Sequence, residues 1–306
     1  MTSENKCKGT LIVVAGPTGS GKTDLSIELA GRFRSPIISF DSRQVFRGMT
    51  IGTAQPSTTQ RAAVRHYFIS DREPSDDYNS GKFAVEALAL LDRLFEEYSY
   101  VIAVGGSGLY IDALCYGFDD LPRPDKELRR RLEDRLAEEG VEALAVELRA
   151  LDPDYYESVD RNNPARVLRA LEVCITTGKP YSAQRSGAKA EREFDIVKVG
   201  IDMPRGELYA RINKRVDLML EEGLEAEARL LYGYKGLNAL NTVGYKELFE
   251  YFDGVVTFDE AVELIKRNSR RYAKRQITWF GRDDEIKWFG REEVDKIENF
   301  VKKFAE

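Results

Sequence analysis

Residues 11–30 read LIVVAGPTGSGKTDLSIELA, and this stretch decides the fold. The apolar run at 11–15 is typical of a buried strand, and the apolar spacing over 22–33 is typical of a helix. Between them, GPTGSGKT at 16–23 matches the pattern G-x-x-x-x-G-K-[ST] in the strand–loop–helix context that the pattern requires. The stretch therefore predicts a P-loop, a loop that binds phosphate groups, and leaves open whose phosphates it binds.

Phosphate chemistry explains the residues of this loop. Its glycines allow tight turns and let backbone N–H groups approach phosphate oxygens. Lys22 supplies a positive charge, Thr23 offers its hydroxyl to Mg²⁺, and the following helix directs the positive end of its dipole at the anion. The residues expected to bind phosphate are Gly16, Pro17, Thr18, Gly19, Ser20, Gly21, Lys22 and Thr23.

Further strand and helix patterns follow this first unit. We predict strands at 37–40, 100–104, 194–204 and 286–289, and helices at 83–98 and after the Gly-Gly turn at 105–106. Alternating strands and helices are typical of a parallel sheet with right-handed crossovers. The predicted fold is therefore α/β, a P-loop NTPase-like parallel sheet flanked by helices.

Between about 119 and 187 only helical patterns occur, and strand patterns return at 194. The simplest interpretation is an all-helical insertion domain within an α/β domain. We expect a discontinuous catalytic core at 1–118 and 190–306 and a helical insertion domain at 119–189.

Composition excludes several classes of protein. The chain has 306 residues with 42% apolar and 32% charged content, and no apolar run approaches the roughly 20 residues of a membrane span. His66 is the only histidine, which excludes multi-histidine metal sites and disfavours a Ser-His-Asp triad. Cys7, Cys115 and Cys174 form no metal-binding or disulfide pattern. Without a signal-peptide core at the N-terminus, we expect a cytoplasmic protein.

Asp41 follows the second predicted strand, whereas no carboxylate ends the strand at 100–104. A P-loop nucleotidase usually has an Asp after a later strand to hold Mg²⁺. Because carboxyl ends of parallel strands meet at one edge, we expect Asp41 to face the phosphate site. Its alternative role is to cap the following turn.

The sequence resembles the tRNA dimethylallyltransferases, also called tRNA isopentenyltransferases, over nearly its whole length. The segments that carry the resemblance occur in order: GPTGSGKT, SFDSRQVFRGMTIGTAQP, VGGSGLY, ARVLRALEV, TVGYKE and YAKRQITWF. It implies transfer of the dimethylallyl group of dimethylallyl diphosphate to N6 of adenosine 37, in tRNAs reading codons that begin with U. The P-loop would then bind the diphosphate of a prenyl donor, with Mg²⁺, and ATP would not be the substrate. The resemblance also implies a monomer.

The resemblance assigns roles to individual residues. Asp41 would accept the proton of the attacking amine, Lys22 and Thr23 would stabilise the leaving diphosphate, and Arg215 would contact it. The residues implied to contact tRNA are Asp41, Ser42, Arg43, Gln44, Ser107, Arg129, Ala165, Arg166, Val167, Leu168 and Arg169. Two positions depart from the family: Ser107 is more often threonine, and Phe46 is often tyrosine.

A basic stretch near the C-terminus stands out against the net charge of −6. It contains Lys266, Arg267, Arg270, Arg271, Lys274 and Arg275. Helical spacing would give these residues one basic face, typical of RNA binding or of a solvated surface. We predict tRNA contacts from Arg271, Lys274 and Arg275.

Three other functions share parts of these features. An ATP-dependent kinase of a small metabolite would share the P-loop and the fold. An RNA-binding protein could keep a degenerate P-loop as a structural turn, although intact Lys22, Thr23 and Asp41 disfavour that. An adenylate isopentenyltransferase would prenylate free adenine nucleotides, whereas the helical insertion and the basic stretch favour tRNA.

Overall fold

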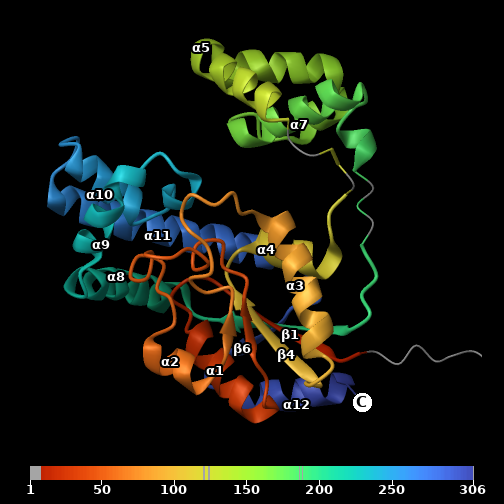
Figure 1. The fold of residues 1–306 in the computed structure, drawn as a ribbon, viewed down its shortest axis with the longest axis vertical. Coiled ribbons are helices and arrows are strands. Elements are labelled where there is room, and N and C mark those ends of the chain that lie inside the picture. The colour runs from red at the N-terminus through yellow and green to blue at the C-terminus, as the bar shows by residue number, and fades with distance from the viewer. Residues whose placement is uncertain (1–7, 120, 123–124, 186, 188, 306) are drawn as a thin grey trace, which may run out of the picture. The chain divides into compact units, whose positions relative to one another are not determined.

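The computed structural model describes residues 8–119, 121–122, 125–185, 187 and 189–305. In this part of the chain six strands form one parallel sheet in the order β3-β2-β4-β1-β5-β6 (Figure 1). The strands are β1 (Thr10–Ala15), β2 (Ile37–Ser39), β3 (His66–Tyr67), β4 (Tyr100–Gly105), β5 (Asp195–Asp202) and β6 (Lys287–Gly290). The predicted parallel α/β sheet is confirmed.

The short edge strand β3 was not predicted. It pairs with β2 only through Ile37↔His66 and Ile38↔Tyr67, so it is too short to show a period of two in the sequence. The other strands lie within a few residues of their predicted positions: β2 ends at Ser39 rather than at residue 40, and β5 ends at Asp202 rather than at residue 204.

Helices flank the sheet in the same unit. They are α1 (Lys22–Phe33), α2 (Thr58–Ala63), α3 (Ser80–Leu94), α4 (Gly108–Tyr116), α8 (Arg205–Glu221), α9 (Leu224–Leu231), α10 (Tyr245–Phe252), α11 (Phe258–Phe280) and α12 (Val294–Ala305), with 3₁₀ turns at Tyr232–Tyr234 and Asn238–Leu240. The predicted helix at 83–98 starts earlier and ends at Leu94. No helix of the described residues is long and apolar enough to cross a membrane.

The core of this unit lies on both faces of β1. Leu11, Ile12, Val13 and Val14 are all 0–1% exposed, as expected for a central strand covered on both sides. On one face, Ile12 and Val14 belong to a cluster with side chains of α1 and α12. Complete burial of such a side chain contributes about 1.5–3 kcal/mol. This packing fixes the start of α1, and with it the P-loop.

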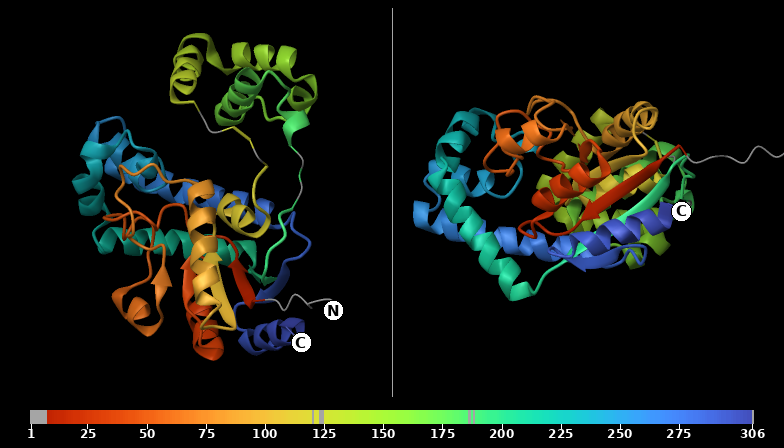
Figure 2. Two further views of the ribbon diagram at one scale, coloured as in Figure 1. Left: turned by 45° about the vertical axis from the view of Figure 1, so that its right-hand side comes forward. Right: turned by 90° about the horizontal axis from the view of Figure 1, so that it is seen from below.

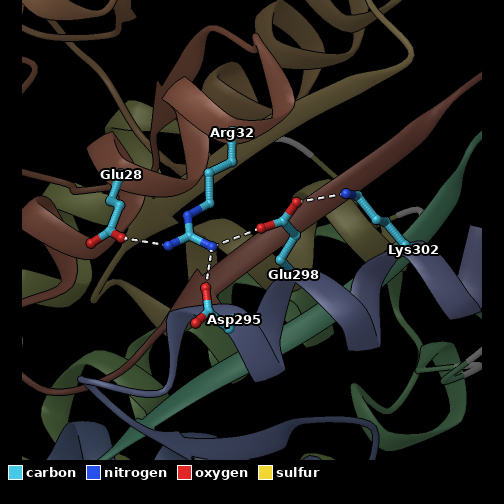
Figure 3. Close-up of polar contacts among 5 residues, drawn as sticks. All are labelled: Glu28, Arg32, Asp295, Glu298 and Lys302. Carbon is cyan, nitrogen blue, oxygen red and sulfur yellow. Dashed lines mark hydrogen bonds and ion pairs between the residues drawn. The ribbon is translucent and has the colours of Figure 1, made fainter.

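A charged network joins α1 to α12 at the surface (Figure 3). Arg32 Nη1 donates to Asp295 Oδ1 at 2.5 Å and to Glu298 Oε2 at 2.7 Å, and Arg32 Nη2 donates to Glu28 Oε1 at 3.0 Å. Lys302 Nζ donates to Glu298 Oε1 at 2.6 Å. The network fixes the register between two helices that are far apart in sequence.

The chain divides into two compact units. The first comprises Met1–Cys115 and Arg192–Glu306, and the second comprises Tyr116–Glu191. The second unit is helical in its described residues, with α5 (Lys126–Leu151), α6 (Pro153–Ser158), α7 (Pro164–Thr177) and a 3₁₀ turn at Ser182–Gln184. It has its own apolar core, which includes Leu144, Leu148 and Leu171. Cys115 and Cys174 are buried free thiols, and Cys7 lies outside the described residues.

Candidate active site

A cavity of about 540 Å³ lies at the carboxyl ends of β1, β2 and β4 in the first unit. The loops after these strands form part of its wall, and residues of α8 and α11 form another part. These two helices lie side by side (Figure 2). Open parallel sheets bind ligands at this edge. The predicted site residues that line the cavity are Thr18, Lys22, Thr23, Asp41, Ser42, Arg43, Gln44, Arg215, Arg271 and Arg275.

The P-loop has the backbone that its glycines predict. Gly21 is the N-cap residue of α1 with a φ of 90°, a conformation that a side chain would strain. At Gly19 (φ 83°), a Cβ would lie 2.9 Å from Ile212 Cγ1 of α8. The hydroxyl of Ser20 is buried and has no hydrogen-bond partner among the described residues. A phosphate oxygen is an acceptor that would satisfy such a hydroxyl.

Two half-buried cations lie beside this loop. Lys22 Nζ donates to the Pro17 carbonyl at 2.7 Å, and Arg215 Nη1 donates to Thr18 Oγ1 at 3.3 Å. Burial lowers the pKa of Lys22 to about 7, and the nearby Arg215 charge acts in the same direction. Burial also lowers the pKa of Arg215, against the opposing effect of Asp41. Because both cations face neutral acceptors, this part of the cavity favours a multiply charged anion.

Asp41 combines the two roles that the sequence left open. Its Oδ1 accepts the N–H groups of Arg43 at 2.9 Å and of Gln44 at 3.3 Å, so the carboxylate caps the turn after β2. It also lines the cavity. The turn therefore holds the carboxylate in a fixed orientation at the edge of the sheet. Arg43 donates to the Asn238 carbonyl at 2.6 Å, and burial lowers the pKa of its guanidinium.

Ser107 connects three segments around this carboxylate. Its Oγ accepts the N–H of Ser42 at 3.0 Å and donates to Ser42 Oγ at 3.2 Å. The Tyr272 hydroxyl of α11 also hydrogen-bonds to Ser107, and burial, together with the Asp41 charge, raises the pKa of Tyr272 to about 12. The serine hydroxyl thus fulfils a structural function at a position where the family more often has threonine. Phe46, the other departure, is 3% exposed.

A half-buried anchor holds the loop at 49–56, which forms another part of the cavity wall. The carboxylate of Glu227 on α9 accepts the N–H groups of Thr50, Ile51 and Gly52 at 2.8–2.9 Å. Tyr245 Oη donates to the same carboxylate at 2.6 Å. From the other side, the Gln44 amide donates to the carbonyls of residues 53 and 54. Gln44 therefore positions this loop in addition to lining the cavity.

The basic stretch of α11 divides into paired and exposed cations. Lys266 Nζ lies 2.8 Å from Asp217 Oδ1, and Arg270 Nη1 donates to Asn213 Oδ1 at 2.6 Å, so these two side chains dock on α8. The exposed basic residues are Arg267, Arg271, Lys274 and Arg275. Their spacing places them along one strip of the helix.

The remaining predicted residues belong to the second unit. Ala165 and Arg166 are exposed in the first turn of α7, whereas Val167 and Leu168 are 0% and 2% exposed in the core. The side chains of Val167 and Leu168 are therefore not available to a partner. Arg129 and Arg169 are half-buried and converge on the buried Glu172, with nitrogen–oxygen distances of 3.4 and 3.5 Å.

Several residues that line or support the cavity were missed from the sequence because distant segments supply them. The buried Gln276 of α11 hydrogen-bonds to the P-loop, and Glu227 holds the loop at 49–56. His66 donates through Nδ1 to the Val64 carbonyl at 2.8 Å, and it also lines the cavity. Burial lowers its pKa. Only contacts across the fold reveal these positions.

The side chains present suit a metal ion that arrives with its substrate. The described residues contain no group of three or more His, Cys, Asp or Glu side chains that could hold a metal ion. Mg²⁺ is usually held by one or two protein oxygens together with substrate phosphates and water. The hydroxyl of Thr23, at the start of α1 and in the cavity wall, is such an oxygen.

Together, the parallel sheet, the P-loop and the cation-lined cavity define a phosphate-binding α/β protein. Comparison with known proteins identifies the family within this class. The model of the family described as IPP transferase matches residues 44–283. The chain belongs to the IPP transferase family.

Relatives and solved structures agree with this membership. A protein of Porphyromonas gingivalis named tRNA dimethylallyltransferase 2 is 53% identical over 278 residues, which are 91% of this chain and 93% of that protein. The full-length tRNA isopentenylpyrophosphate transferase of Bacillus halodurans has a TM-score of 0.72 at 38% identity, covering 97% of this chain and 96% of that one. A eukaryotic dimethylallyltransferase acting on tRNA has a TM-score of 0.76 at 26% identity, covering 97% and 77%.

Proposed function

We propose that this enzyme transfers the dimethylallyl group of dimethylallyl diphosphate to N6 of adenosine 37, in tRNAs reading codons that begin with U. The names of its relatives support prenyl transfer to tRNA as the reaction. The observation that carries the proposal is that Lys22 and Arg215 share one cavity with Asp41. This arrangement suits an anionic leaving group beside a group that accepts a proton.

The donor's diphosphate binds at the P-loop. As the bond between C1 of the allylic group and the diphosphate oxygen breaks, the electron pair goes to the diphosphate, and negative charge grows there. Lys22 and Arg215 stabilise this charge from half-buried positions in which hydrogen bonds to the loop already hold them, so little reorganisation is needed. The Thr23 hydroxyl would hold Mg²⁺, which would supply further positive charge for the leaving diphosphate.

The acceptor adenine binds on the side of Asp41. Its N6 amine forms the new bond to C1 and loses one proton, which the Asp41 carboxylate accepts. The turn that holds Oδ1 of Asp41 orients this carboxylate before the substrate arrives. Ser42, Arg43, Gln44 and Ser107 surround the base, which must leave its stack to enter a cavity.

Basic residues of both units bind the rest of the tRNA. On the first unit these are Arg271, Lys274 and Arg275, which are exposed on α11. On the second unit, the helical insertion domain at 119–189, Arg129 and the segment 165–169 contribute, the latter through Arg166, Arg169 and the backbone. We propose that the enzyme works in the cytoplasm as a monomer and that the anticodon stem-loop is the part of tRNA that it contacts.

Nucleoside mapping tests this proposal. An unmodified tRNA reading a UNN codon is incubated with the enzyme, Mg²⁺ and dimethylallyl diphosphate, then digested and examined by mass spectrometry. The proposal predicts N6-dimethylallyladenosine at position 37 and none in a matched tRNA with guanosine at that position. Prenylation of AMP but not of tRNA would instead identify an adenylate isopentenyltransferase.

A further inference from the structure

Gln276 of α11 bridges the P-loop and the loop after β4. It is 5% exposed, and its side-chain amide uses both of its ends. Oε1 accepts the N–H of Thr18 at 2.8 Å, and Nε2 donates to the Gly106 carbonyl at 2.8 Å. These contacts connect three segments that lie far apart in the sequence, and both backbone partners border the cavity.

Close packing fixes where this amide can lie. A Cβ at Gly106 would be 2.1 Å from Gln276 Nε2, so any side chain there would displace the amide. One turn further along α11, a Cβ at Gly108 would be 2.2 Å from the Trp279 ring, whose Nε1 donates to Asp112 Oδ2 at 3.0 Å. The glycines of the loop after β4 therefore accommodate α11, and the helix docks there in a single register.

Thr18 transmits this fixed position to the phosphate site. Its backbone N–H is held by Gln276 on α11, and its hydroxyl accepts a hydrogen bond from Arg215 on α8. Thr18 is thus held at both its backbone and its side chain by two helices outside the loop. A shift of its backbone would move the Arg215 contact and the following N–H groups of the loop together.

We propose that Gln276 is a positioning residue for the donor's diphosphate, acting through its bridge between Thr18 and Gly106, which both hydrogen bonds are needed to hold. This inference rests on the proposed function, in which the P-loop binds a prenyl diphosphate. Without the amide, the Thr18 N–H and the Gly106 carbonyl lose their buried partners, and the loop can relax away from the geometry that binds the anion. Trp279 still docks α11 at Gly108 and Asp112 when the amide is absent, so the exposed basic strip keeps its place and tRNA affinity is not expected to change.

Binding of inorganic pyrophosphate to the full-length enzyme in the presence of Mg²⁺ tests the inference without turnover. Gln276→Met keeps the side-chain length and removes both hydrogen bonds. Gln276→Glu keeps an acceptor for Thr18 but cannot donate to Gly106. Thr278→Ala, at an exposed position on the same helix, is the matched control.

Both Gln276 variants should bind pyrophosphate about tenfold more weakly, with a similar rise in the KM for the prenyl donor, while the Kd for tRNA changes less than about twofold. The control should match the wild type. Pyrophosphate affinity at the wild-type level in either folded variant, or an equal loss of tRNA affinity, would overturn the inference. Thermal unfolding identifies the folded variants, and because the two substitutions perturb the core differently, either one is sufficient. Lack of prenyl transfer by the wild type would overturn the proposed function instead. The two failures can be distinguished because pyrophosphate binding is measured without turnover.

Discussion

Asp41 caps a turn and, in the proposed mechanism, also accepts a proton, and a substitution can separate these two roles. Asn keeps an oxygen that can accept the N–H groups of Arg43 and Gln44, but it cannot accept the proton of the adenine amine. We expect Asp41→Asn to lower kcat by about 10²–10⁴-fold with little change in tRNA affinity or thermal stability. Steady-state kinetics together with tRNA binding would measure this.

The surface variant Asp77→Asn, which loses only an exposed pair with Lys82, is the control and should retain full activity. Near-normal kcat in Asp41→Asn would remove the carboxylate from proton transfer and leave it as a turn cap.

The lowered pKa of Lys22 leads us to expect that kcat/KM for the prenyl donor depends on pH. Burial lowers its pKa to about 7 in the free enzyme, whereas a bound diphosphate favours the charged form and raises that pKa. The contribution of Lys22 to donor binding is therefore fully present below the free-enzyme pKa and is lost as pH rises from that pKa toward the raised pKa of the complex. We expect kcat/KM for the donor to fall from about pH 7 to 9, by up to tenfold per pH unit.

In the Lys22→Met variant, kcat/KM for the donor should be lower than in the wild type and should not decline between about pH 7 and 9. A wild-type profile that stays level over this range would contradict the assignment of the decline to Lys22.

Among single residues, the sequence pointed to those candidate site residues that lie close together along the chain. The P-loop residues and Asp41 are recognisable because a turn, a strand end and a helix start lie within a few positions of one another. The sequence did not assign Gln276, Tyr272 or Glu227 to the site. The role of each depends on partners that are distant in the sequence and that only the fold brings close. For Val167 and Leu168, a motif alone could not distinguish exposed from buried positions of a helix.

Among the elements, the loop at 49–56 depends on an anchor outside itself. Glu227 accepts three backbone N–H groups and the Tyr245 hydroxyl, and a glutamine would offer an N–H₂ group to some of these donors. We expect Glu227→Gln to lower the free energy of unfolding by about 2 kcal/mol and to reduce transfer as well. Denaturant unfolding and kinetics would measure both effects.

Glu225→Gln is the matched control on the same helix, because Glu225 pairs only with Arg229 at the surface. Its cost should stay below about 1 kcal/mol. Equal stability of the two variants would show that the loop holds itself without the Glu227 anchor.

The exposed basic strip of α11 should contribute to the salt dependence of tRNA binding. Neutralising Arg271 and Arg275 to glutamine removes two cations that are free to meet phosphates, so the slope of log K against log salt should decrease by about 1.5. Filter binding over a salt series would measure this slope.

Lys266→Gln on the same helix removes a cation that is already paired with Asp217, and its slope should equal that of the wild type. An unchanged slope in the double variant would make the strip an ordinary solvated surface.

Elements with strong local signals were predictable, and short ones were not. The strand β1, the helix α1 and the helical character of the second unit follow from apolar spacing and glycine placement. The strand β3 has two residues and exists because β2 offers an edge to pair with. The predicted helix at 83–98 ends early because residues 95–97 form a turn before β4.

At the scale of the whole molecule, one chain combines a phosphate-binding sheet with a separate helical unit. Each unit has its own apolar core, which is why the sequence shows a clear change of pattern near 119 and another near 194. The identity of the phosphate ligand is not contained in either pattern. It follows from the family and from the placement of Lys22, Arg215 and Asp41 around one cavity.

The most direct test asks which donor the enzyme uses. Unmodified tRNA is incubated with the enzyme and Mg²⁺, together with either dimethylallyl diphosphate or ATP, and the mass of the intact tRNA is measured. We predict that the tRNA gains one dimethylallyl group with dimethylallyl diphosphate alone, without any requirement for ATP, and remains unchanged with ATP alone. Unchanged tRNA with the prenyl donor, together with phosphate transfer from ATP to a small metabolite, would contradict the account and make the P-loop an ATP site.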